Sequence, residues 1–290
     1  MANMYHVRSN SFSSTSHPSS IRIEEELSKM RTWEATSTST SESIGTGLSL
    51  LEDVFICLED FLNMASTQKV ISNHQGEKCM EELLDCLVRV LDICGIIRNT
   101  MLQVKENVQA LHSALRRRKG DSSIEKSVAE YNLFTRKMKK SAKKLISSLK
   151  QMKSKSRASP VLNQDQDPDA LMRVLREVIT KNMSIFQTIL SYLAVPASKA
   201  KPTKWLMVAN LMHKRVISCE EKSQNFNELQ FVEGSLGTLV SECTDVLKVQ
   251  ALREGLGGLE NAIESIENGL ERMFRRLVRT RANLLNIMTP

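Results

Sequence analysis

The side chains that most often carry catalysis or bind metals are few in this sequence, and they form no recognisable set. Five histidines are scattered along the 290 residues without a partner at the spacing of a metal site, namely His6, His17, His74, His112 and His213. Pairing His74 with Cys79 would need further ligands that the sequence does not supply. Motifs for a nucleophilic serine, a phosphate-binding loop or an HExxH zinc site are absent. We therefore expect a non-enzymatic protein with no cofactor and no bound metal.

The six cysteines are interpreted as reduced thiols. Five of the six lie in apolar helical runs, and no secretory signal directs them to an oxidising compartment; they are Cys57, Cys79, Cys86, Cys94, Cys219 and Cys243. Such thiols behave as small apolar side chains. No apolar stretch approaches the about 20 residues of a membrane-spanning helix. We expect an intracellular, cytoplasmic protein, with the nucleus or an organelle left open as alternatives.

Positive charge is concentrated in one segment of this sequence. Residues 116–157 hold fifteen basic and three acidic residues, a net charge of +12, whereas the whole chain carries +7. At helical spacing, four cations from Arg136 to Lys143 share one face, while Met138 and Leu145 lie on another. The candidate docking surface consists of Arg116, Arg117, Arg118, Arg136, Lys139, Lys140, Lys143 and Lys144.

Three kinds of target and one structural explanation are left open for this basic helix. It could meet an acidic protein, an anionic membrane surface or nucleic acid. Nucleic acid is the least favoured target, because no aromatic residue lies among the basic residues from 136 to 157 to stack on bases. Alternatively, acids on neighbouring helices simply balance a solvated face. The identity of a protein partner, and whether the chain forms homo-oligomers, stay open as well.

Two long apolar seams define the helices that would position this surface. In the first, residues recur at alternating steps of four and three: Leu83, Leu87, Val90, Cys94, Ile97, Met101, Val104, Val108, Leu111 and Leu115. The second runs through Leu256, Leu259, Ile263, Ile266, Leu270, Met273, Leu277, Thr280, Leu284 and Ile287. This spacing is typical of coiled coils and long-helix bundles. It predicts an all-α fold, an elongated bundle of long antiparallel helices with coiled-coil-like heptad seams.

Breaks in the pattern divide the chain. We predict a disordered Ser/Thr-rich tail with a short helix over 1–42, a helical half with the basic helix over 43–157, a linker over 158–167, and a second half over 168–290 that packs on the first. The tail offers Ser9 and Ser11 beside Arg8 as candidate phosphorylation sites. Gly95, within the first seam helix, is interpreted as a point of close helix approach or a bend.

Several blocks of sequence resemble a known family. They are RSNSF at 8–12, KCMEELLD at 78–85, LHSALRRRK at 111–119, GLERMFRRL at 269–277 and RTRANLLNI at 279–287. In this order they resemble a plant-specific family of helical proteins related to the BYPASS proteins. The resemblance implies an intracellular all-helical plant protein associated with root and shoot development. That family has no established catalytic residues, so the resemblance assigns none here.

Overall fold

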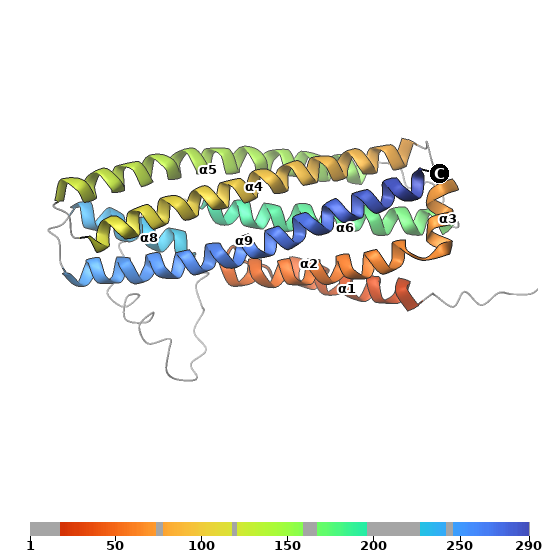
Figure 1. The fold of residues 1–290 in the computed structure, drawn as a ribbon, viewed down its shortest axis with the longest axis horizontal. Coiled ribbons are helices and arrows are strands. Elements are labelled where there is room, and N and C mark those ends of the chain that lie inside the picture. The colour runs from red at the N-terminus through yellow and green to blue at the C-terminus, as the bar shows by residue number, and fades with distance from the viewer. Residues whose placement is uncertain are drawn as a thin grey trace, which may run out of the picture.

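The computed structural model describes residues 18–73, 78–117, 121–158, 167–195, 227–241 and 246–289. These residues form helices and no strand, which confirms the all-α prediction. The helices are α1 (Pro18–Thr36), α2 (Ser41–Leu62), α3 (Ala65–Asn73), α4 (Lys78–Arg116), α5 (Asp121–Ala158), α6 (Asp167–Ala194), α8 (Glu228–Ser241) and α9 (Val246–Met288). Figure 1 shows the long helices lying side by side in an elongated bundle, with α3 across one end.

The two predicted seams pack against each other through α4 and α9. All ten seam residues of α4 are buried, from Leu83 to Leu115. On α9, nine of the ten are buried, and only Ile287 is partly exposed. Because a strip of this length cannot remain in water, its burial explains why these two helices form the centre of the bundle.

Ion pairs flank the α4–α9 seam and fix its direction. Arg98, Lys105 and His112, each seven residues apart on α4, meet acids on α9. Lys105 pairs with Glu267 at 2.9 Å, and His112 Nδ1 lies 2.9 Å from Glu260; Arg98 pairs with Glu271 and lies 4.5 Å from the centroid of the Phe274 ring. Rising numbers on α4 meet falling numbers on α9, so the two helices are antiparallel.

The opposite flank of α9 pairs with α2, and here the helices run in parallel. Arg272 Nε lies 2.7 Å from Glu52, and Arg276 lies 2.9 Å from Glu59. Gly269 lets the Leu48 side chain approach, since an added Cβ at position 269 would lie 2.7 Å from it. The helix dipole alone could account for the late arginines of α9. In the structure, Arg272 and Arg276 also pair with glutamates of the neighbouring helix α2.

Residues 18–36, at the end of the predicted tail, form a helix that packs into the bundle. The inward face of α1 buries Ile23, Leu27, Met30 and Trp33. The Trp33 indole donates a hydrogen bond to the Ser43 carbonyl at 2.9 Å, and its ring occupies the space that a side chain at Gly47 would need.

Helices α6 and α8 meet at Asn227. This buried side chain caps α8 by accepting from the Leu229 N–H at 2.9 Å. Its amide donates to the carbonyl of Tyr192, in the last turn of α6, at 3.0 Å, and to the carbonyl of Ser39 at 3.4 Å. One side chain therefore connects three segments that are distant in sequence. Most of the predicted 158–167 linker lies outside the described residues.

The interpretation of Gly95 as a close-approach site is wrong. A Cβ added there would meet nothing within 4 Å. The glycines that permit close packing are Gly47, Gly255 and Gly269, which face the side chains of Trp33, Phe231 and Leu48.

Candidate docking surface

Helix α5 separates a buried apolar stripe from a cationic face. The stripe packs toward α4 and α6 and contains Val128, Tyr131, Thr135, Met138, Ala142 and Leu149. The outward cations are exposed, and we call them the α5 cationic face: Arg136, Lys137, Lys140, Lys143, Lys144 and Lys150. The last acid before this face is Glu130, and residues 131–158 hold ten basic and no acidic residues.

Helical geometry gathers these six cations into one surface. At about 100° per residue they span an arc of about 140°, opposite the buried stripe. From Arg136 to Lys150 the face is about 21 Å long, at about 1.5 Å per residue. Leu133 lies within the same arc, one turn before Lys137, and is 56% exposed.

Two further basic residues of α5 point toward the bundle, and both are paired. Lys139 lies 2.5 Å from Glu233 of α8, whose side chain is only 7% exposed. Burial raises the pKa of Glu233, an effect that the Lys139 ammonium opposes. Lys153 lies 2.9 Å from Glu34 of α1.

The six cations of the face differ from these two. Among the described residues, none of the six has a carboxylate oxygen within 4.0 Å. Among the described side chains of residues 131–154, the basic residues therefore form a paired, bundle-facing group and an exposed group with no carboxylate oxygen within 4.0 Å.

The structure brings together only some of the residues that the sequence proposed. Arg136, Lys140, Lys143 and Lys144 are exposed on one face, whereas Lys139 is paired and half-buried. Arg116 and Arg117 are exposed at the end of α4, where α5 begins, about 22 Å along the axis from Arg136. Arg118, Ser9 and Ser11 lie outside the described residues. Lys137, Lys150 and Leu133 join the face although the sequence did not single them out.

Helix α4 also exposes apolar side chains. Helix α4 lies beside α5 (Figure 1) and carries Ile96 at 45% exposure and Leu102 at 49%. Single exposed apolar residues are common on protein surfaces. Similar ones occur on α1 (Ile21, 47%) and α9 (Val278, 45%), so Ile96 and Leu102 do not by themselves mark the α5 side of the bundle.

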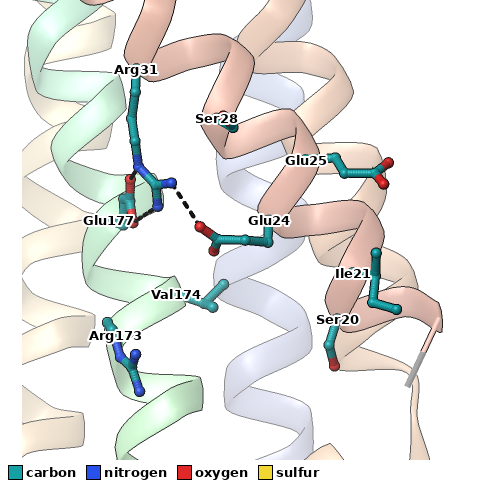
Figure 2. Close-up of a pocket in the computed structure, with 9 residues that line it drawn as sticks. All are labelled: Ser20, Ile21, Glu24, Glu25, Ser28, Arg31, Arg173, Val174 and Glu177. Carbon is teal, nitrogen blue, oxygen red and sulfur yellow. Dashed lines mark hydrogen bonds and ion pairs between the residues drawn. The ribbon is translucent and has the colours of Figure 1, made fainter. Parts of the chain in front are cut away.

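A second surface feature is a groove of about 660 Å³ between α1 and α6. Figure 2 shows Arg31 reaching from α1 to Glu177 of α6, with Glu24 on its other side and Glu25 pointing away. Arg31 binds both carboxylate oxygens of Glu177, at 2.7 and 2.8 Å, and Glu24 at 2.7 Å. These hydrogen bonds raise the pKa of Arg31, and the largest contribution comes from those to Glu177. The arrangement holds α1 against α6. Arg31 is fully engaged by these carboxylates, and Arg173 of α6 is the second cation that lines the groove (Figure 2).

The described residues offer few reactive groups. Cys57 and Cys94 are buried free thiols, and burial raises the pKa of Cys94 to about 12. No cluster of three or more His, Cys, Asp or Glu side chains suited to a metal ion occurs in the described ranges. Nor does any helix there combine the length and apolar composition needed to cross a bilayer.

Comparisons with known proteins give one family. A search of curated proteins and a search of solved structures produced no match. The family model described as Protein BPS1 matches residues 47–287, from within α2 almost to the end of α9. That span covers most of the chain and contains four of the five sequence blocks that resemble the BYPASS-related proteins, all but the one at 8–12. The chain therefore belongs to the BPS1 family.

Proposed function

We propose that this chain is a non-enzymatic interaction protein of plant development that docks on its target through the α5 cationic face. Membership of the BPS1 family supports the developmental context. The observation that carries the proposal is the set of six exposed cations that have no countercharge nearby among the described residues, on a helix whose bundle-facing Lys139 and Lys153 are paired.

A purely solvating role for this face is less well supported. Solvated surfaces usually mix both signs of charge, and α1 does so: its exposed residues include Arg22, Glu24, Glu25 and Lys29. The α5 cationic face has one sign only. Mutual repulsion among its lysines costs stability, and a bound anionic surface would relieve that repulsion.

The remainder of the structure supplies a rigid support. Helix α5 packs on both α4 and α6 along its buried stripe. The backbone positions that carry the cations are therefore fixed along the bundle, which reduces the ordering that binding requires.

The test is complementation in a plant line that lacks the gene. One variant changes Lys137, Lys140, Lys143 and Lys144 to Gln. The matched control removes the same amount of charge elsewhere, by changing Lys29, Lys69, Lys78 and Arg173 to Gln, four exposed cations on α1, α3, α4 and α6. Circular dichroism and thermal unfolding verify that both variants fold.

We expect the wild type and the control to restore root and shoot growth, and the α5 variant to fail. Equal rescue by the α5 variant would show that the α5 cationic face is not the working surface, and the proposal would be withdrawn.

A further inference from the structure

We infer that the target of the α5 cationic face is the surface of an anionic lipid bilayer. This inference rests on the proposed docking role of the same face and adds the chemical class of the partner. It follows from the types of cation on the face, from their arrangement along the bundle and from the exposed apolar side chain among them.

The face consists mainly of lysine. Five of its six cations are Lys, and only Arg136 is Arg. An arginine fork suits bidentate binding of one carboxylate, as Arg31 shows with Glu177. A lysine ammonium acts as a compact charge on a flexible stem. The negative charge of an anionic bilayer is spread over its surface and has no fixed positions. A group of flexible ammonium charges suits such a surface better than it suits a set of carboxylates at fixed positions.

The arrangement suits a broad, flat target. The six cations follow the outward side of α5, a long helix at one edge of the elongated bundle (Figure 1). Their alignment along about 21 Å lets all of them approach a planar surface together. Their ends can adjust to the positions of individual headgroups because each lysine stem is flexible.

Apolar side chains distinguish a bilayer from other polyanions. Leu133 lies within the cationic arc and is 56% exposed. At a bilayer such groups can enter the boundary between headgroups and acyl chains. They gain nothing from the phosphates of a nucleic acid duplex.

A protein or single-stranded nucleic acid partner fits this face less well. Protein interfaces usually depend on Trp, Tyr or Arg anchors, and single strands are held by stacking on aromatic rings. Residues 135–158 include no aromatic residue. The aromatic side chains nearest in sequence point inward: Tyr131 is buried and Phe134 packs against the core.

The experiment is flotation of the purified full-length chain with vesicles of phosphatidylcholine alone or with about 30% phosphatidylserine, at about 0.15 M salt. The samples are the wild type, the α5 Gln variant and the matched Gln control defined above. A fourth sample changes the same four α5 lysines to Arg, which keeps the charge. A fifth, Leu133→Ser, keeps all cations and removes the apolar side chain from the face.

We expect the wild type, the control and the Arg variant to float only with the anionic vesicles. Each basic residue near such a surface contributes about a fivefold factor in partitioning, so loss of four lysines should reduce binding by several hundredfold. Leu133→Ser should weaken binding severalfold. High salt should release the wild type.

Failure of the wild type to float, or equal loss of binding in the matched control, would overturn the inference. Tighter binding to a 30-base-pair DNA duplex than to anionic vesicles would also overturn it. If flotation fails while the α5 Gln variant still fails to complement, docking through the face stands and the partner is not lipid. If flotation succeeds while the Gln variant complements fully, the face binds lipid but the proposed function is wrong.

Discussion

Glu34 joins α1 to the rest of the bundle, and replacing it should expose a pH-dependent part of the stability. Its carboxylate accepts hydrogen bonds from Lys181 and Ser184 of α6, both at 2.7 Å, and from Lys153 of α5 at 2.9 Å. Lys181 itself is buried. Burial alone would raise the pKa of Glu34. The hydrogen bonds from Lys181, Ser184 and Lys153 outweigh burial and lower the pKa from 4.5 to about 2.

The sign and size of the effect follow from this shift. Because the pKa is lower in the folded chain, the ionised carboxylate stabilises the fold fully above about pH 4.5, and this stabilisation disappears as the pH falls toward 2. Lowering the pKa of Glu34 from 4.5 to about 2 corresponds to about 3 kcal/mol of stabilisation. The Glu34 side chain is 32% exposed, so solvent screening reduces our expectation to about 2 kcal/mol.

The assay is urea denaturation of the wild type and Glu34→Gln between pH 7 and pH 3. We expect the variant to lose about 2 kcal/mol at pH 7, with the difference narrowing as the pH falls below 4.5, because a protonated carboxyl resembles the amide of Gln. The control is Glu25→Gln, an exposed position on the same helix, which should change stability little at any pH. A difference between wild type and Glu34→Gln that is as large at pH 3 as at pH 7 would refute the reasoning.

Two further predictions concern packing and capping, and thermal or urea unfolding measures both. Gly95→Ala should stabilise the chain by about 1 kcal/mol, because a helix former replaces glycine in open space. Gly47→Ala gains the same helix propensity, but its methyl group would overlap the Trp33 ring, so it should destabilise the chain by about 1–2 kcal/mol. Equal stability changes in the two variants would contradict the close contact between Gly47 and Trp33. Asn227→Ala should cost about 2–3 kcal/mol, because it removes a cap and leaves two carbonyls without their donor. Thr40→Ala, which removes the cap of α2 and a hydrogen bond with the Thr38 hydroxyl, should cost about 1 kcal/mol, and equal losses would show that the Asn227 amide contributes nothing beyond capping.

The helical architecture could be predicted because it depends on periodicity. The steps of four and three in α4 and α9 specify which side of each helix is apolar, and the structure buries these positions. The same periodicity places Arg136 and Lys140 on the side of α5 opposite Met138. The exposure of the main cationic residues therefore followed from local sequence alone.

Partners across helices could not be predicted in the same way. Lys139 and Lys140 are neighbours in sequence and identical in type, yet only Lys139 meets an acid, Glu233, which is 94 residues away. That pairing depends on how α8 is placed against α5, which no local pattern specifies. The role of Gly47 was missed for the same reason, because it depends on the position of the Trp33 ring.

The distribution of charge also explains why a matched control can separate local from overall electrostatics. The segment 116–157 carries a net +12, so the remainder of the chain carries −5 within the total of +7. The Debye length at physiological salt is about 8 Å, and one helix layer is already about 8–10 Å thick. A flat anionic surface against α5 therefore senses the cations of that helix and little of the acidic remainder behind it. Removing four charges from α5 and removing four from other helices give the same net charge but different potentials at the surface. A difference between those two variants would therefore assign docking to α5 rather than to the basic character of the whole chain.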